Sequence, residues 1–96
     1  MTTLHLIRDS ALSNNTVKLS LTNLAIDDVL VLLDDGCYNV NLSFMDDVHK
    51  VLPDTQCYAI TPHLRARDLS SETINTLSYK ELLELIMNHN NVITWQ

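Results

Sequence analysis

The chain has 96 residues, of which 46% are hydrophobic and 19% are charged, and its formal net charge is −6. This length predicts a single domain over 1–96, and the hydrophobic content excludes intrinsic disorder. The negative charge and the presence of only six Lys and Arg residues argue against nucleic-acid binding by the isolated chain, because phosphates require a basic face.

The first eight residues lack the basic start, the long apolar segment and the cleavage site that are typical of a signal peptide. No segment reaches the ~20 apolar residues that a membrane helix needs. We therefore expect a soluble cytoplasmic protein that does not interact with a membrane. In that compartment Cys37 and Cys57 should be reduced, and their spacing fits neither a CxxC redox pair nor a zinc site.

The first third of the chain predicts one strand and one helix. A short apolar run over 4–7 predicts the strand. Ser13 or Asn14 can cap the following helix, which should extend to about Asn23. Its apolar residues recur at i, i+4 and i+7 and are Val17, Leu21 and Leu24.

The aliphatic run over 29–33 is unbroken, whereas a half-exposed strand alternates apolar and polar residues. It therefore predicts a strand that is buried on both faces, as in a parallel sheet. Asp34, Asp35 and Gly36 follow, and the glycine is expected to permit a tight turn. Because ligand and catalytic groups gather at the carboxyl ends of parallel strands, Asp34, Asp35 and Cys37 lie where function is expected.

The middle of the chain continues the alternation. Ser43 is predicted to cap a helix that ends at Pro53, with Asp46 and Lys50 as an i, i+4 ion pair. The run 56–60 predicts the third strand. Thr61-Pro62 then opens a short helical turn that ends at about Arg67, since proline suits the first helical position.

The last third of the chain predicts two strands, over 74–77 and 92–95, with a helix between them. Ser78 and Glu81 form a capping box for that helix, which should end near Asn88. Its predicted buried residues are Leu82, Leu83, Leu85 and Ile86. The whole order predicts an α/β fold, a three-layer flavodoxin-like domain with a mostly parallel five-stranded sheet covered on both faces.

No catalytic, cofactor-binding or metal site stands out. A helix N-terminus near Cys37 could activate that thiol as a nucleophile or a persulfide carrier, but a semi-buried small hydrophobe is the favoured interpretation. Cys57 is expected to be a packing residue. Asp34 and Asp35 resemble the Mg²⁺-binding pair of receiver domains, yet the companion residues of that pattern are missing. We expect a solvated turn there.

Histidine and aromatic residues add few constraints. His5 lies among aliphatic residues and is expected to be a hydrogen-bonded core or interface histidine. The other three, His49, His63 and His89, share no metal-ligand spacing. Core packing and subunit contact are equally compatible with three aromatic residues at predicted strand ends, which are Tyr38, Tyr58 and Trp95.

Several stretches form a pattern that extends over nearly the whole chain. They are Leu4-His5 with Ser10, Val29–Tyr38, Tyr58–Ile60 leading into Leu64–Leu69, and Tyr79 with His89 and Trp95. Together they resemble the TusB/DsrH family of small sulfur-relay subunits. The resemblance implies a DsrE/DsrF/DsrH-like fold and a hetero-oligomer with related C-type and D-type subunits, assembled as a dimer of heterotrimers.

The same resemblance implies a function. In the TusB branch, the assembly passes persulfide sulfur between carrier proteins toward 2-thiolation of the wobble uridine of certain tRNAs. The acceptor cysteine of that assembly belongs to the D-type subunit, so the present chain would be a structural subunit without catalysis or a cofactor of its own.

The sister branch, from sulfur oxidisers, resembles the chain too. Its H-type subunit carries a cysteine within the first helix, where Ser20 lies here by register, and Cys37 falls where an aliphatic residue is usual. This favours the tRNA-thiolation branch. Three alternatives remain open: a sulfur carrier that uses Cys37, an H-type subunit of a sulfur-oxidation complex, and a free-standing homo-oligomeric binding domain.

Overall fold

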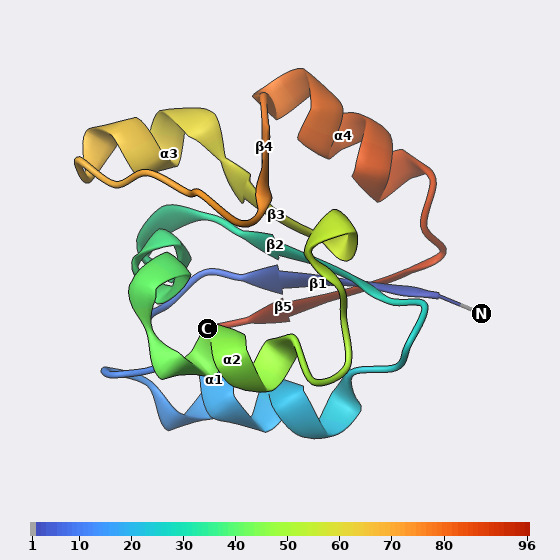
Figure 1. Cartoon of the computed structure of the whole chain (residues 1–96). Coiled ribbons are helices and arrows are strands. Elements are labelled where there is room, and N and C mark those ends of the chain that lie inside the picture. Colours follow the sequence, from blue (N-terminus) through green and yellow to red (C-terminus); the bar gives the residue numbers. More distant parts are fainter. Residues whose placement is uncertain (1) are drawn as a thin grey trace.

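The computed structural model describes residues 2–96, and its centre is a sheet of five parallel strands in the order β4-β3-β2-β1-β5 (Figure 1). The fold is therefore of the α/β class, as predicted. Parallel strands need crossover connections, and helical segments supply them here. The strands are β1 (Thr3–Ile7), β2 (Val29–Leu32), β3 (Cys57–Ile60), β4 (Asn75–Leu77) and β5 (Asn91–Trp95).

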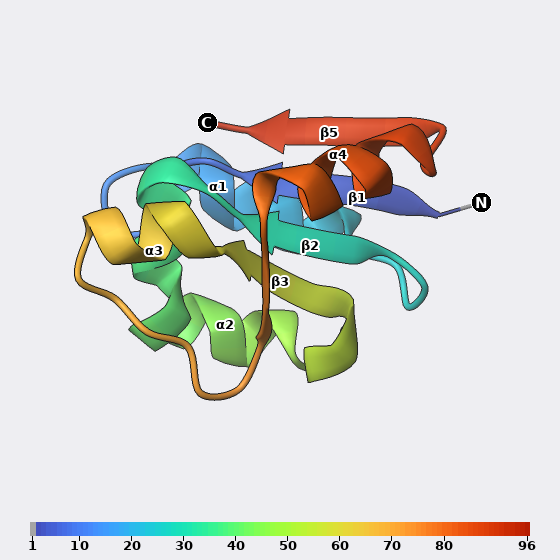
Figure 2. The ribbon, with the colours of Figure 1, turned by 90° about the horizontal axis from the view of Figure 1, so that it is seen from above.

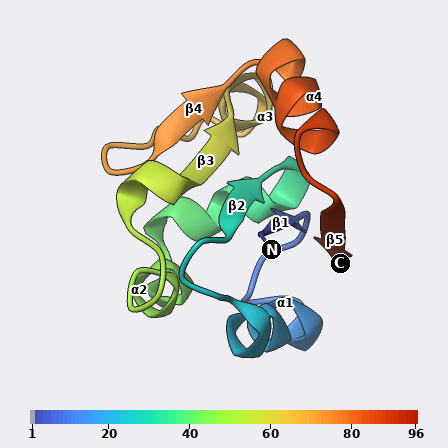
Figure 3. The ribbon, with the colours of Figure 1, turned by 90° about the vertical axis from the view of Figure 1, so that its right-hand side faces the viewer.

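Helices cover both faces of the sheet (Figure 3). Helices α1 and α2 lie on one face and α4 on the other, while α3 follows β3 directly. The α-helices are α1 (Asn15–Leu19), α2 (Ser43–Val48), α3 (Thr61–Ala66) and α4 (Tyr79–Met87). Three short 3₁₀ helices complete the connections: η1 (Ser20–Asn23), η2 (Asp34–Asn41) and η3 (Asp54–Gln56). In the described part of the chain, no helix has the length and apolar character to cross a membrane.

Two apolar cores lie on opposite sides of the sheet, and β2 contributes to both. Leu30 and Leu32 belong to the larger core under α1 and α2, while Val31 belongs to the smaller core under α4. Successive side chains of a strand point to opposite faces, so a strand covered on both faces needs an unbroken aliphatic run. The prediction of a strand buried on both faces is confirmed, since all three side chains are fully buried.

The helix predictions are confirmed in type and corrected in detail. Asn14, rather than Ser13, caps α1, because its side chain accepts a hydrogen bond from the Thr16 backbone N–H at 2.8 Å. This helix tightens into η1 before reaching Asn23. The Ser43 cap was wrong: Leu42 takes the cap position without a side-chain hydrogen bond, and Ser43 is already helical.

Two further details differ from the prediction. Lys50 forms its ion pair with Asp47 at 3.1 Å rather than with Asp46, because the helix ends at Val48 and Lys50 lies beyond its last full turn. On α4, Ser78 and Glu81 form both bonds of the predicted capping box. Leu83, which was expected to be buried, is exposed because it points away from the sheet.

Gly36 plays a different role from the predicted one. No glycine has a positive φ, and the left-handed residue after β2 is Asp34, with φ 51°. Gly36 is required for space instead, since a Cβ atom there would lie 1.9 Å from the backbone oxygen of Ile7. The segment after β2 forms η2 rather than a simple tight turn, and it lies directly against the end of β1.

A buried polar link connects the two ends of the chain with its middle. Trp95 donates its indole N–H to Nδ1 of His5 at 3.1 Å, so Nε2 of His5 carries the proton and donates to Asp28 at 2.9 Å. Asp28 also accepts the backbone N–H groups of Thr3 and Ala25, both at 2.9 Å. His5 is thus a hydrogen-bonded core histidine, as expected, and Trp95 packs against the larger core.

Asp28 is almost completely buried, yet it remains a good acceptor. Burial by itself would raise the pKa of its carboxyl. The hydrogen bonds from His5, Thr3 and Ala25 outweigh that effect and lower the pKa below its usual value. The charged form of Asp28 is therefore stabilised by the folded structure.

Candidate functional site

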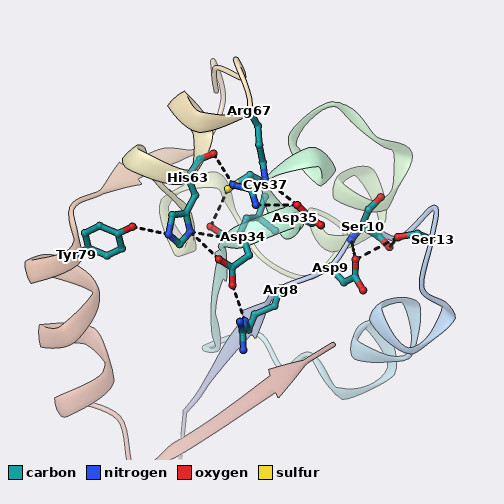
Figure 4. A network of polar contacts seen from close by, with 11 residues as sticks. Arg8, Asp9, Ser10, Ser13, Asp34, Asp35, Cys37, His63, Arg67 and Tyr79 are labelled. Carbon is teal, nitrogen blue, oxygen red and sulfur yellow. Dashed lines mark hydrogen bonds and ion pairs between the residues drawn. The ribbon is translucent and has the colours of Figure 1, made fainter.

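The carboxyl ends of the parallel strands meet at one edge of the sheet, which we call the carboxyl edge. Arg8 follows β1, Asp34 follows β2, His63 follows β3 and Tyr79 follows β4. Figure 4 shows these side chains pointing toward one another. In open parallel sheets this is the edge at which ligands bind, so it is the candidate functional site.

Asp34 is at the centre of the carboxyl edge. Its carboxylate accepts a hydrogen bond from Nε of Arg8 at 2.8 Å, and its backbone N–H donates to Nδ1 of His63 at 2.8 Å. Its φ of 51° is left-handed, a conformation that Asp tolerates better than most residues but that still costs about 1 kcal/mol. These two bonds hold the backbone in that conformation.

The bond from Asp34 determines which nitrogen of His63 is protonated. Because Nδ1 accepts the Asp34 N–H, the proton lies on Nε2, which donates to the hydroxyl of Tyr79 at 2.8 Å. The rings of His63 and Tyr79 also meet edge to face, with centroids 5.3 Å apart. The Tyr79 hydroxyl keeps its own proton for an acceptor in the solvent or on another molecule.

A second ion pair flanks the first. Arg67, which follows α3, binds Asp35 through two nitrogens at 2.9 and 3.0 Å, and it also donates to the backbone oxygen of His63 at 3.2 Å. Its guanidinium lies 5.9 Å from the centre of the Tyr38 ring. Both arginines at the carboxyl edge are therefore paired with aspartates, which leaves no strong positive field for an anionic ligand.

Cys37 lies beneath this network and is fully buried, where the sequence suggested a partly buried side chain. Its thiol points toward the backbone oxygen of Leu32 at 3.6 Å. Burial raises the pKa of Cys37 to about 11, although the charge of Arg67 opposes the increase. The thiol is therefore protonated at neutral pH, so Cys37 is a poor nucleophile in this conformation.

Cys57 and Ser20 are enclosed in the same way as Cys37. Cys57 is fully buried, and burial raises its pKa to about 12. Ser20 is also buried and donates its hydroxyl to the backbone oxygen of Val17 at 2.6 Å. The two cysteines are free, without a disulfide.

The two aspartates of the carboxyl edge are not arranged as metal ligands. Asp34 and Asp35 each face an arginine, and residues 2–96 contain no group of three or more His, Cys, Asp and Glu side chains arranged to hold a metal ion. A surface hollow of about 240 Å³ lies between α1 and α2, away from the carboxyl edge, and is lined by Leu12, Lys18, Phe44 and Asp47 among others.

Sequence reasoning named Asp34, Asp35 and Cys37 but missed Arg8, His63, Tyr79 and Arg67 as members of one site. A usable signal was present. Each of the first three missed residues follows a predicted strand within three positions, and parallel strands end at the same edge. The register of the strands, which the sequence does not show, makes them neighbours.

The fold and the carboxyl edge define a class: a small α/β domain whose polar groups are paired with one another and whose thiols are enclosed. The family model "DsrH like protein" matches residues 9–92, and the chain belongs to this DsrH-like family. The family is one of sulfur relay, and its members are generally parts of multi-subunit complexes. No curated protein matches the chain.

The solution NMR structure of protein Tm0979 from Thermotoga maritima is similar in fold. The superposition has a TM-score of 0.63 and covers 90% of this chain and 93% of Tm0979, at 18% sequence identity. This likeness supports the DsrE/DsrF/DsrH-like fold that the resemblance implied.

Proposed function

We propose that this chain is a structural subunit of a cytoplasmic sulfurtransferase complex, and that it carries no sulfur itself. One observation carries the proposal: both cysteines are fully buried, and burial raises both of their pKa values. A persulfide carrier needs an ionised and accessible thiol, and sulfur transfer needs a second protein to reach it. Membership of a sulfur-relay family then leaves a supporting role.

In more detail, we propose that the complex acts in 2-thiolation of the tRNA wobble uridine. We further propose that the chain assembles with C-type and D-type subunits into a dimer of heterotrimers. Ser20, at the position where the sulfur-oxidation branch has a cysteine, supports this branch. The net charge of −6 supports a chain that meets tRNA only through other subunits. We also propose that the chain is one domain without catalysis of its own, because both of its thiols are enclosed.

The partner proposal is tested by purifying the chain from its own cells at natural expression level. We expect two related small subunits to co-purify in equal amounts. Deleting the chain should then lower the 2-thiouridine content of tRNA, as measured by mass spectrometry of digested tRNA. Unchanged 2-thiouridine would instead favour the sulfur-oxidation branch, and a chain that is isolated alone would contradict the complex.

The thiols are tested by replacing Cys37 and Cys57 with alanine together in the same cells. We expect the complex to assemble and the 2-thiouridine content to stay at the wild-type level, because neither thiol carries sulfur. Incubating the purified wild-type chain with a persulfide donor gives the matching control. An extra sulfur on Cys37 in its mass spectrum, with loss of transfer in Cys37→Ser, would overturn the proposal and favour the carrier.

A further inference from the structure

A strained backbone and a titratable side chain meet at one point of the carboxyl edge. In the described part of the chain, Asp34 and Asp68 are the two residues other than glycine with a positive φ. Asp68 follows α3, where a left-handed residue is common, whereas Asp34 begins η2. Figure 2 shows η2, in teal to green, beside the yellow helix α3 at the carboxyl ends of the strands. Strain of this kind persists only where neighbouring contacts enforce it, and it clusters at functional and switching sites.

The contact that enforces the strain requires a neutral imidazole. Nδ1 of His63 accepts the Asp34 N–H at 2.8 Å, which it can do only while it carries no proton. The other ring nitrogen, Nε2, already donates to Tyr79 at 2.8 Å. A second proton on the ring would make Nδ1 a donor that faces another donor at hydrogen-bonding distance. The protonated ring and the Asp34 N–H therefore cannot keep their present positions.

An acceptor for the added proton belongs to the same residue. Oδ1 of Asp34 lies 3.7 Å from Nδ1 of His63, while Oδ2 accepts Nε of Arg8 at 2.8 Å. A movement of about 0.5–1 Å brings Oδ1 within ordinary hydrogen-bonding distance of the ring. The Asp34 carboxylate then lies between two positive charges, which favours the protonated ring.

The other titratable and charged groups in contact with His63 accept both forms of the ring. Arg67, from the end of α3, donates to the His63 backbone oxygen at 3.2 Å, and its charge is paired with Asp35. Tyr79, from α4, accepts from Nε2, which keeps its proton in both forms. Protonation therefore changes the bonds on the Nδ1 side of the ring, toward η2.

The peptide unit between Leu33 and Asp34 is the part that must rotate. Its N–H faces His63, and its carbonyl oxygen accepts the Gly36 N–H at 2.9 Å. The peptide plane is rigid, so its two ends move together. Rotation turns the N–H away from the ring, takes Asp34 out of the left-handed region and moves the carbonyl away from the Gly36 N–H. The first turn of η2 loosens as a result.

We propose that His63 and the peptide unit 33–34 form a pH-sensitive switch at the carboxyl edge. While the ring is neutral, Nδ1 holds the Asp34 N–H and the first turn of η2 is closed. When Nδ1 takes a proton from the solvent, it donates to the Asp34 carboxylate, the peptide rotates and the Gly36 N–H is released. Histidine is suited to this role, because it ordinarily changes its charge between about pH 5 and 8.

The switch gives the carboxyl edge two arrangements. In the protonated form, the N–H groups of Asp34 and Gly36 lose their present acceptors and become donors at the edge where open parallel sheets bind ligands. The inference goes beyond the proposed function and does not depend on it, because the purified chain alone is sufficient for the test.

The test is an NMR titration of the full ¹⁵N-labelled chain from about pH 8 to about pH 5. We expect the backbone amide signals of Asp34 and Gly36 to shift with the same midpoint as the ring nitrogens of His63. The Gly36 amide should lose protection from hydrogen exchange by roughly tenfold in the acid form, after correction for the intrinsic effect of pH, because one hydrogen bond is lost.

His63→Gln is the sharpest variant. The glutamine oxygen can accept the Asp34 N–H and its amide nitrogen can donate to Tyr79, but the side chain does not titrate. The amide signals of Asp34 and Gly36 should therefore keep their alkaline positions over the whole pH range.

His49→Gln is the matched control. His49 also contacts an aspartate, with Nε2 at 3.2 Å from Asp54, but it lies at the C-terminal end of α2. Its replacement should leave the shifts of Asp34 and Gly36 as they are in the wild type.

Asp34→Asn provides a second, independent test. Asparagine tolerates the left-handed region as aspartate does, and it keeps the backbone N–H that binds His63. It removes the charge that stabilises the protonated ring, so the common midpoint should move to lower pH. This variant also decides the question if His63→Gln does not fold.

Amide signals of Asp34 and Gly36 that do not follow the His63 ring would overturn the proposal. So would a transition that persists in His63→Gln, one that disappears in His49→Gln, or a midpoint that Asp34→Asn leaves in place. A ring that stays neutral at Nδ1 down to about pH 5 in the folded chain would also contradict it.

Discussion

His5 and His63 are each held through both ring nitrogens, but in opposite surroundings. His5 is buried, accepts the Trp95 indole N–H and donates to the Asp28 carboxylate. His63 lies near the surface, accepts a backbone N–H and donates to the Tyr79 hydroxyl. In both rings the proton lies on Nε2.

The two histidines differ in whether water can replace a hydrogen-bond partner that is lost. If a partner of His5 is removed, a donor or acceptor stays buried without a bond, and the full desolvation penalty is felt. If a partner of His63 is removed, water takes its place at small cost. The buried network should therefore control stability, and the carboxyl edge should be available for change without unfolding.

The largest effect is expected for Asp28→Ala. The substitution leaves three donors without an acceptor: the buried Nε2–H of His5 and the partly buried backbone N–H groups of Thr3 and Ala25. We expect a loss of about 3–5 kcal/mol in the free energy of unfolding, measured by urea denaturation. Asp27→Ala, the exposed neighbour, should change it by less than about 0.5 kcal/mol. Equal effects of the two variants would contradict the assigned role of Asp28.

The second largest effect is expected for Gly36→Ala, which tests how closely η2 packs against the end of β1. The new Cβ would lie 1.9 Å from the Ile7 oxygen, so backbone must move. We expect a loss of about 3 kcal/mol in the same assay. Asp35→Ala, one residue earlier, is the control and should cost far less. A stable Gly36→Ala variant would show that η2 does not pack against the end of β1 as described.

The pH dependence of stability sharpens the comparison. The folded chain lowers the pKa of Asp28 below its ordinary value of 3.8. The stabilisation from this group is therefore complete above that value and is lost as the pH falls from 3.8 toward the lower folded pKa. Stability measured between neutral and acid pH should fall less steeply in Asp28→Asn than in the wild type. Parallel curves for the two proteins would refute the assignment.

A smaller loss is expected for Trp95→Phe. The phenyl ring keeps most of the packing against the core but has no N–H, so Nδ1 of His5 loses its donor. We expect a cost of about 1–2 kcal/mol in the free energy of unfolding. Because Trp95 is the only tryptophan, circular dichroism rather than fluorescence must follow the unfolding of this variant. A cost below about 0.5 kcal/mol would mean that the indole bond contributes little.

Tyr79→Phe should have the smallest effect. It removes the hydroxyl that accepts from His63, but both side chains are near enough to the surface for water to bind Nε2 instead. We expect less than about 0.5 kcal/mol by urea denaturation. A loss as large as that of Trp95→Phe would show that the carboxyl edge is as tightly coupled to folding as the buried network.

Local patterns explain most of what could be predicted. The unbroken run 29–33 and the capping box at Ser78 each depend on neighbours in the chain, and each agrees with the structure. The helix that was expected to end at Pro53 ends at Val48 instead. The predictions were wrong where a contact between residues far apart in the sequence determines the local structure. Gly36 was assigned a turn role because its contact with Ile7, 29 positions earlier, has no local signature. Leu83 was expected to be buried because its helix was read without its orientation on the sheet.

The carboxyl edge shows the same limit. Asp34 and Asp35 were found because they follow an obvious strand, but their partners Arg8 and Arg67 could not be assigned from spacing. Likewise, the sequence marked His5 and Trp95 as residues of interest, 90 positions apart, without indicating that they bind each other.

The order of strands and helices, the acidic charge and the absence of a catalytic motif follow from the amino-acid sequence alone, because each depends on residue type and local spacing. The pairing of Asp34 with Arg8 and His63, the enclosure of both thiols and the bond from Trp95 to His5 follow only from the folded chain. They depend on which strands become neighbours, and neighbours in a parallel sheet are brought together by crossovers that separate them widely in sequence.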